Sequence, residues 1–197
     1  MAGPIDDTKR ALRADIRERR QQRSEPARHE AAAGVQRNLD ALVARLGARS
    51  MSCYRSTPTE PSTRPFLHDA LARGLRVLLP ISRTDGLLDW VAGDNENDVV
   101  EGLLGIEEQT GERLSPLAVD KVDLLIIPAA AVDRSGMRLG WGRGYYDKTL
   151  GSMQTRPPVY AVVFDTELVD ELPHDLHDQP VTGVVTPTRI VELASTY

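Results

Sequence analysis

The stretch VDLLIIPAAAVDRSGMRLGWGRGYYD, residues 122–147, decides the fold. Its first part contains four consecutive aliphatic residues, 124–127. An unbroken apolar run of this kind is typical of a parallel strand that is buried on both faces. Its second part is rich in glycine and arginine, and in open α/β sheets ligands bind where the carboxyl ends of the strands enter such loops. The stretch therefore predicts a central strand followed by a ligand-binding loop.

Strand-like and helix-like segments alternate along the rest of the chain. Apolar runs at 75–80 and 159–164 predict two more buried strands. Apolar residues at helical spacing predict a helix that is capped by Ser24, extends to about Leu46 and ends at Gly47. This alternation predicts an α/β fold: a single three-layer α/β/α domain over residues 1–197 with a mostly parallel, Rossmann-like central sheet. The polar segment 94–115 is expected to be irregular.

A basic helix is expected over residues 7–22, packed on this domain. Residues 9–23 hold seven Lys or Arg residues and two acidic residues. The apolar stripe of Leu12 and Ile16 is too narrow for a core helix, so the helix is expected to lie on the surface. The charge run fits a solvated face. It also fits a cationic wall for an anion, because Lys9 and Arg13 are one helical turn apart.

Composition limits the class of protein. The formal net charge of −5 argues against a general nucleic-acid binder, and no segment approaches the roughly 18 apolar residues of a membrane span. The single cysteine, Cys53, excludes an intrachain disulfide and is typical of a reducing compartment. We therefore expect a cytoplasmic protein without nucleic-acid or membrane partners.

The glycine loop, residues 138–144 (RLGWGRG), is suited to holding phosphate. Its three alternating glycines would each cost roughly 1 kcal/mol inside a helix, and successive backbone amides in such a loop can converge on an anion. A helix beginning near Tyr145 would add its positive N-terminal dipole, and Arg138 and Arg143 can bind phosphate oxygens bidentately. We interpret the loop as a polyphosphate cradle, although neither the P-loop nor the dinucleotide fingerprint is present. Asp147, early in that helix, either offsets the helix dipole or holds magnesium on the phosphates.

Residues 133–147, with the pattern DxxGxRLGxGxGYYD, resemble the signature of the 5-formyltetrahydrofolate cyclo-ligase (5,10-methenyltetrahydrofolate synthetase) family. The resemblance continues along most of the chain in the family's order. Lys9 and Arg13 are similar to the family's N-terminal Lys-x-x-x-Arg, Glu60 to a folate-side glutamate, and Asp178 to the aspartate of a late His-Asp pair. The chain departs from the family pattern, away from the glycine loop, at Gln109, Val132 and Thr182.

The resemblance implies an ATP- and magnesium-dependent ligase of folate one-carbon metabolism. Such an enzyme converts 5-formyltetrahydrofolate to 5,10-methenyltetrahydrofolate and releases ADP and phosphate, through an iminium phosphate in which the formyl oxygen carries the γ-phosphoryl group. Phosphoryl transfer needs mainly positioning and charge neutralisation, so no nucleophilic side chain is required. The implied folate substrate is accepted with or without a polyglutamate tail, and the implied assembly is a monomer or a weak homodimer.

The resemblance and the loop chemistry together assign candidate residues to four roles. The candidate catalytic residues are Arg138, Arg143 and Tyr146. The candidate ATP-binding residues are Lys9, Arg13, Arg138, Leu139, Gly140, Trp141, Gly142, Arg143, Gly144, Tyr145 and Tyr146. The candidate folate-binding residues are Glu60, Trp90 and Tyr146, and the candidate magnesium ligands are Asp147 and Asp178. One of the two adjacent tyrosines is expected to face the substrate and the other to pack, and a core position suits Trp90 equally well.

Two other classes of function stay open on the residues alone. A sugar-phosphate isomerase or a deaminase suits the same fold class, but it needs a positioned general base, and no Glu or His in the glycine loop is placed for that role. A non-catalytic nucleotide- or RNA-binding module suits a chain that has lost the loop glycines or Asp147, whereas this chain has both.

Overall fold

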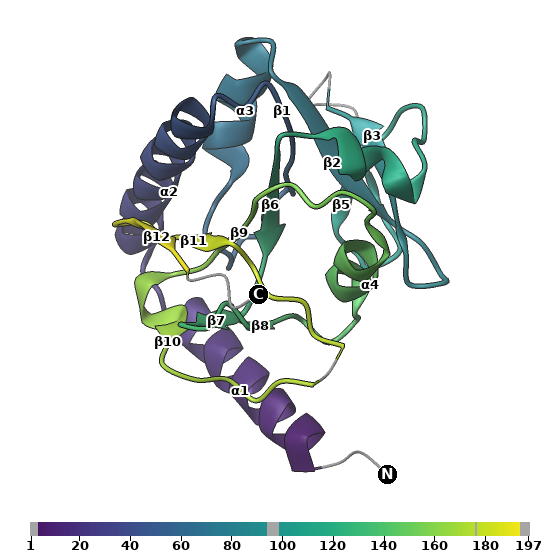
Figure 1. Cartoon of the computed structure of the whole chain (residues 1–197). Coiled ribbons are helices and arrows are strands. Elements are labelled where there is room, and N and C mark those ends of the chain that lie inside the picture. Colours follow the sequence, from purple (N-terminus) through teal and green to yellow (C-terminus); the bar gives the residue numbers. More distant parts are fainter. Residues whose placement is uncertain (1–3, 94–98, 176, 194–197) are drawn as a thin grey trace.

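The computed structural model describes residues 4–93, 99–175 and 177–193, and its centre is a seven-stranded sheet in the order β12-β11-β9-β6-β1-β2-β3 (Figure 1). The parallel strands are β1 (Ser50–Ser52), β2 (Arg76–Ser82), β6 (Leu124–Pro128), β9 (Val159–Val162) and β11 (Gly183–Val185). The antiparallel edge strands are β3 (Leu88–Ala92) and β12 (Ile190–Glu192). The predicted α/β fold with a mostly parallel sheet is confirmed.

Helices cover both faces of this sheet. The α-helices are α1 (Pro4–Gln21), α2 (Glu25–Leu46), α3 (Arg64–Ala72) and α4 (Tyr145–Ser152), and the 3-10 helices are η1 (Pro116–Lys121) and η2 (Asp165–Glu167). Helix α2 has the predicted caps: the Ser24 side chain accepts a hydrogen bond from the backbone N–H of Ala27, and Gly47 ends the helix with a φ of 61°.

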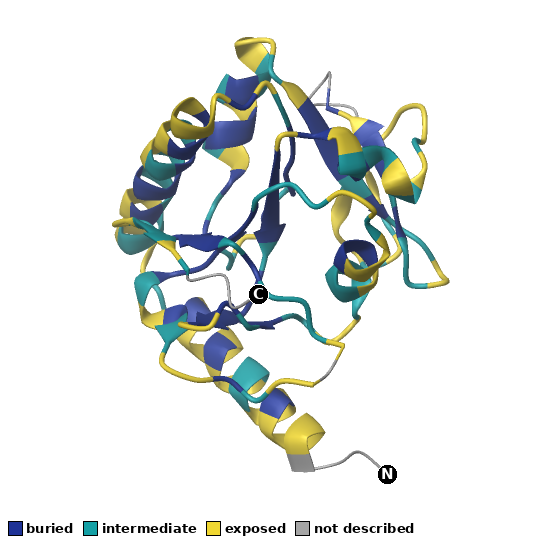
Figure 2. Ribbon diagram, viewed as in Figure 1, coloured by how far each residue is buried: buried dark blue, intermediate teal, exposed yellow. Residues whose placement is uncertain are grey.

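Strand β6 lies in the middle of the sheet and is buried on both faces, as its sequence predicts. Leu124 and Ile126 belong to the core that includes α2 and α3, whereas Leu125 and Ile127 belong to the core that includes η1 and α4. Alternate side chains of one strand therefore serve two cores, which gives three layers. Figure 2 shows the buried residues concentrated in the sheet and on the helix faces that cover it.

Helix α1 lies on the surface and buries a narrow stripe that includes an arginine as well as the apolar residues. It lies against a small sheet formed by β7 (Ala131–Asp133), β8 (Arg138–Leu139) and β10 (Leu168–Val169) (Figure 1). Ile16 is 2% exposed, and Arg20 is 1% exposed because it forms a 2.7 Å ion pair with Glu167 and donates to the backbone oxygen of Ala129. Most of the other residues of α1 are exposed, in keeping with a helix that lies on the surface. Arg20 supplies part of the buried face of the helix, and a search for apolar residues at helical spacing does not detect a buried arginine.

The segment 94–115, expected to be irregular, contains a hairpin of β4 (Val99–Glu101) and β5 (Glu107–Gln109). Its turn includes Gly105 with a φ of 68°, and the Glu108 carboxylate accepts a 2.8 Å hydrogen bond from the Ser82 backbone N–H at the end of β2. The strands are short and mostly polar, so no alternating pattern marks them. Residues 94–98 of the same segment lie outside the described residues. Among the described helices, none is long and apolar enough to cross a membrane.

Candidate active site

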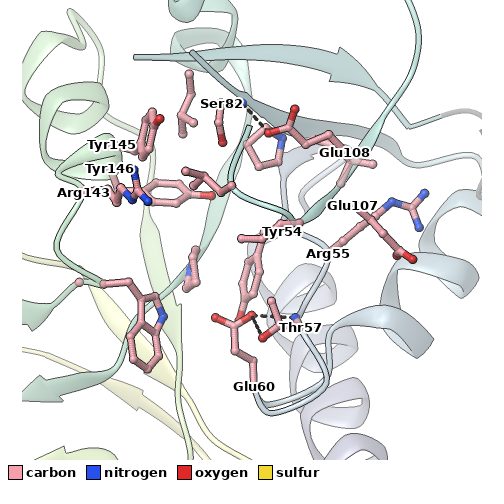
Figure 3. A pocket seen from close by; sticks show the side chains of 18 of the residues that line it. Tyr54, Arg55, Thr57, Glu60, Ser82, Glu107, Glu108, Arg143, Tyr145 and Tyr146 are labelled. Atoms are coloured by element: carbon pink, nitrogen blue, oxygen red, sulfur yellow. Dashed lines mark hydrogen bonds between the residues drawn. The ribbon is translucent and has the colours of Figure 1, made fainter. Parts of the chain in front are cut away.

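A cavity of about 530 Å³ opens at the carboxyl ends of the central strands (Figure 3). Tyr54 follows β1, Ser82 ends β2 and Pro128 ends β6, and all three line the cavity. The remaining walls come from α1, the loop 55–60, the β4–β5 hairpin, the glycine loop and the start of α4. The cavity therefore lies at the edge of the sheet where open α/β proteins bind their ligands.

The glycine loop connects β8 to α4 and requires glycine at two positions. Gly142 has a φ of 90°, and Gly144, the N-cap of α4, has a φ of 69°, values that other residues rarely adopt. Arg13 of α1 donates from Nε to the Gly140 backbone oxygen at 2.6 Å. Its guanidinium also covers Gly142, where an added Cβ would lie 3.4 Å from Arg13 Cζ. The structure thus places the basic helix and the glycine loop face to face.

Arg138 and Asp147, predicted for catalysis and for metal binding, form an ion pair. Arg138 Nη2 donates to Asp147 Oδ1 at 2.7 Å, and Arg138 Nη1 donates to the Gln179 backbone oxygen. The Arg138 side chain is 2% exposed. Burial lowers the pKa of its guanidinium, and the Asp147 charge opposes that effect. Asp147 Oδ1 accepts a second bond, from the Gln179 backbone N–H at 3.3 Å.

Lys9 and Asp178, predicted for ATP and magnesium, also form an ion pair. Lys9 Nζ donates to Asp178 Oδ2 at 2.7 Å and to Asp175 Oδ2 at 2.6 Å. Burial lowers the pKa of Lys9, but these two hydrogen bonds and the charges of the aspartates outweigh it, so the net pKa is raised. Burial raises the pKa of Asp178, but the bonds from Lys9 and the Asp175 backbone N–H outweigh it, so the net pKa is lowered.

The two predicted magnesium ligands fit the donor set that magnesium uses with nucleotides. Magnesium usually binds through one or two carboxylates, phosphate oxygens and water. Asp147 and Asp178 each commit one oxygen to the ion pairs above, and the charges of both oppose the lowering of the Arg138 pKa by burial. Among the described residues there is no group of three or more Asp, Glu, His or Cys side chains that could hold a metal ion.

The two adjacent tyrosines differ in their contacts. The Tyr145 hydroxyl donates to the backbone oxygen of Arg83 at 2.8 Å, which ties α4 to the turn after β2. Both rings line the cavity and pack against the core below it. The Tyr146 hydroxyl makes no such bond with the residues that the structure describes. Burial, followed by the charges of Cys53 and Glu60, raises the pKa of Tyr146 well above its usual value. The hydroxyl of Tyr145 is therefore committed to the protein backbone, whereas no such bond from a described residue holds that of Tyr146.

Glu60 and Trp90, both predicted for folate, lie in different environments. Glu60 lines the cavity, and its Oε2 accepts hydrogen bonds from the Thr57 backbone N–H at 2.8 Å and from Thr57 Oγ1 at 3.0 Å (Figure 3). Trp90 is fully buried in the core and donates its indole N–H to the Pro116 backbone oxygen at 3.2 Å. Trp90 is not among the cavity-lining residues, so the structure corrects its assignment as a substrate-stacking residue.

The other candidate ATP residues divide between the cavity and the core. Gly140, Trp141, Arg143 and Gly144 line the cavity. The Trp141 ring lies beneath Arg17 and Arg20, whose Cζ atoms are 5.2 and 5.0 Å from its centroid. Leu139 is 1% exposed and packs in the small core under α1, so only its backbone is available to a ligand.

Sequence reasoning missed several residues of the cavity wall. The apolar ones are Leu79, Pro80, Leu88, Leu104 and Ile106, and α1 contributes Arg17 and Gln21. Tyr54 is a further wall residue, 5% exposed, and its hydroxyl has no hydrogen-bond partner among the described residues. Tyr54 is a single aromatic residue, and no local sequence pattern marks it as part of a site.

Comparison with known proteins places this arrangement among folate enzymes. The model of the 5-formyltetrahydrofolate cyclo-ligase family matches residues 5–187. A 5-formyltetrahydrofolate cyclo-ligase from Mycolicibacterium smegmatis is 34% identical over 187 residues, which cover 92% of this chain and 95% of the relative. A protein of the same name from Escherichia coli K12 is 33% identical over 150 residues, covering 74% of this chain and 81% of the relative.

Solved structures show the same fold. The structure of a 5,10-methenyltetrahydrofolate synthetase from Aquifex aeolicus has a TM-score of 0.80 and 26% identity, and the match covers 96% of this chain and 94% of that one. A 5,10-methenyltetrahydrofolate synthetase from Mycoplasma pneumoniae has a TM-score of 0.73 and 17% identity over 91% of this chain and 98% of that one. At that identity, the second match supports the fold alone.

Proposed function

Because the chain belongs to the 5-formyltetrahydrofolate cyclo-ligase family, we propose that it converts 5-formyltetrahydrofolate and ATP to 5,10-methenyltetrahydrofolate, ADP and phosphate, with magnesium. The observation that carries the proposal is the contact of Arg13, on the basic helix that also bears Lys9, with a glycine loop that borders a cavity containing Glu60. A charged anion site and a partly apolar cavity then share one wall, which includes Gly140, Trp141, Arg143 and Gly144. That arrangement suits the joining of a polyphosphate and a pterin.

The reaction chemistry requires little from side chains except position and charge. The formamide carbonyl is a weak electrophile and its oxygen is a poor leaving group, so transfer of the γ-phosphoryl to that oxygen activates it. The neighbouring folate amine then attacks the formyl carbon, and phosphate leaves with the former carbonyl oxygen. Lys9, Arg13, Arg138 and Arg143 would neutralise the transferred phosphoryl charge, and the amides of the glycine loop would orient it.

Other groups of the site support this scheme. Asp147 and Asp178 would hold the magnesium ion, which offsets phosphate charge when it is bound. Tyr146, on the cavity side of α4, would contact the folate near the reacting atoms. No thiol is needed: Cys53 is buried, and burial raises its pKa to about 12, so it stays protonated near neutral pH.

The proposal also covers the location, the assembly and the range of substrates of the enzyme. We include a cytoplasmic location, supported by the single buried cysteine, and a monomer or weak homodimer as the assembly. Folates with and without polyglutamate tails are proposed as substrates. The isomerase, deaminase and non-catalytic alternatives lose their support, because family membership accounts for both the fold and the loop.

A spectrophotometric assay tests the function. Purified protein with magnesium-ATP and fresh 5-formyltetrahydrofolate should produce the near-ultraviolet absorbance of the methenyl product, with one ADP formed per product molecule. Omission of ATP, or chelation of magnesium with EDTA, should abolish the signal. Absence of product under complete conditions, or product formation that does not depend on ATP, would contradict the proposal.

A further inference from the structure

Arg20 of α1 is held at the carboxyl end of the central strand. Its side chain is 1% exposed. Nε donates to Glu167 Oε1 at 2.8 Å and Nη2 donates to Glu167 Oε2 at 2.7 Å, so the two side chains form a bidentate ion pair. Nη2 also donates to the backbone oxygen of Ala129 at 2.9 Å, one residue beyond the end of β6. The guanidinium is therefore fixed to both η2 and the end of β6.

The same guanidinium contacts the glycine loop. Its Cζ lies 5.0 Å from the centroid of the Trp141 ring, a distance at which a cation is attracted to the face of an indole. Trp141 lies between Gly140 and Gly142. Glycines have a wide choice of backbone conformations and no side chain that could anchor the loop. The Trp141 ring is therefore the anchor through which Arg20 can fix the backbone of the loop in one conformation.

Stability alone does not account for the Arg20–Glu167 pair. A buried ion pair contributes little net stability, because the loss of hydration offsets the attraction, and apolar side chains of similar volume often serve as well. Arg20 Nη1 is also buried and has no hydrogen-bond partner among the described residues, which adds a further cost. What the pair does supply is a planar cation in a fixed position beside the loop.

We propose that Arg20, oriented by Glu167, is a positioning residue that holds the Trp141 ring and thereby keeps the glycine loop in the conformation that receives the ATP phosphates. Trp141 lines the cavity, whereas Arg20 and Glu167 are not among the cavity-lining residues, so both act through Trp141. The inference rests on the proposed function for the identity of the ligand that the loop binds. It adds to that function two buried residues that position the site without touching a substrate.

Two variants that interrupt the same contact test the inference. Arg20→Met combined with Glu167→Gln removes both charges, so no unpaired charge is left in the interior to unfold the protein. Trp141→Leu removes the ring and leaves the ion pair. Each variant should lower kcat/KM for ATP about 10- to 100-fold, the cost of a slightly displaced binding group, while the KM for 5-formyltetrahydrofolate changes much less. All three substitutions together should cost no more than either variant alone, because they interrupt one contact.

Control variants separate positioning from a structural role. Trp141→Phe keeps an aromatic ring and should keep most of the activity. Arg23→Met removes a cation 3.6 Å from the centroid of the Phe164 ring, a contact of the same kind outside the cavity. It should lower stability in urea unfolding and leave kcat/KM unchanged. If the ion-pair variant does not fold, Arg20→Lys replaces it, because lysine keeps the charge but lacks the planar fork. Losses that multiply in the combined variant, or an equal loss in Arg23→Met, would overturn the inference.

Fluorescence of the ligand-free protein gives a second readout. The chain has two tryptophans, and Trp90 is fully buried, so quenching by acrylamide reports mainly on Trp141. Loss of the ion pair should free the Trp141 ring and raise the quenching constant, whereas Arg23→Met should leave it at the wild-type value. An unchanged constant in the ion-pair variant would contradict the proposed anchoring. This measurement needs no substrate, so it still tests the anchoring if the wild-type protein shows no turnover and the proposed function fails.

Discussion

The two halves of the site differ in whether their polar groups already have partners within the protein. In the charged half, which consists of Lys9, Arg13, Arg138, Asp147 and Asp178, each cation already contacts a carboxylate or a backbone oxygen. In the cavity half, which consists of Tyr54, Glu60 and Tyr146, the hydroxyl of Tyr54 and one oxygen of Glu60 have no partner among the described residues.

This difference predicts two kinds of binding. A ligand of the charged half has to exchange partners with existing ion pairs, so its affinity depends on a high negative charge. A ligand of the cavity half displaces no protein contact and gains hydrogen bonds directly. We therefore expect substitutions in the charged half to affect turnover most strongly, and substitutions in the cavity half to affect mainly the affinity for the folate.

The largest effect is expected for Arg138→Ala. The change removes a buried guanidinium between Asp147 and the Gln179 backbone oxygen, and loss of one aligned donor at a developing charge typically costs roughly 10²–10³-fold in turnover. Steady-state kinetics should show kcat falling by about that factor, with the KM for folate changed much less.

Arg134→Ala is the control for this variant, because Arg134 lies in the same segment and its side chain is 79% exposed. The control should keep its activity. Urea unfolding should establish that Arg138→Ala still folds, and Arg138→Lys should recover only part of the rate, because lysine lacks the planar fork. Unchanged ATP affinity and turnover in Arg138→Ala would remove the glycine loop from the phosphate site.

An intermediate effect is expected for Glu60→Gln. Loss of a charge-assisted hydrogen bond costs about 1.5–3 kcal/mol, so the KM for 5-formyltetrahydrofolate should rise roughly 10- to 100-fold while the KM for ATP stays constant. Glu112→Gln, an exposed acid outside the cavity, is the matched control. A larger effect on ATP than on folate would show that the two halves are not divided as we describe.

The smallest effect is expected for the ion pair of Lys9 and Asp178, whose contribution to the free energy of unfolding depends on pH. The pKa of Asp178 is lowered in the folded state, so its contribution is present above its ordinary value of about 3.9 and is lost as the pH falls through the folded value. The pKa of Lys9 is raised, so its contribution is present below about 10.4 and is lost as the pH rises through the folded value.

Asp178→Asn measures this contribution. Urea unfolding should show the variant less stable than the wild type at pH 7, by no more than about 1 kcal/mol for this partly exposed pair. The difference should shrink toward zero in acid, where the wild-type carboxyl is protonated as well. Asp170→Asn, at the exposed Arg134 pair, is the control. A difference that persisted undiminished in acid would exclude the ion pair as its source.

Local sequence patterns predicted much of the fold and part of the candidate site. The features that they missed depend on residues that are far apart in the sequence. Leu124–Ile127 and the glycine loop are continuous in sequence, so the central strand and the loop beside the cavity could be predicted. The partners of Lys9 lie 166 and 169 residues away, and no local pattern specifies them. Trp90 and Tyr54 are single aromatic residues, and only the packed structure shows that the first lies in the core and the second borders the cavity.

The position of α1 has a consequence for how the protein is made. This helix is synthesised long before its contacts: Gly140 follows Arg13 by 127 residues, Glu167 follows Arg20 by 147, and Asp178 follows Lys9 by 169. A nascent chain that ends before these partners contains the basic helix, but the helix cannot yet form its contacts with them. The charged half therefore assembles only after residue 178 has been synthesised, and a chain that terminates before that residue cannot form the Lys9–Asp178 ion pair.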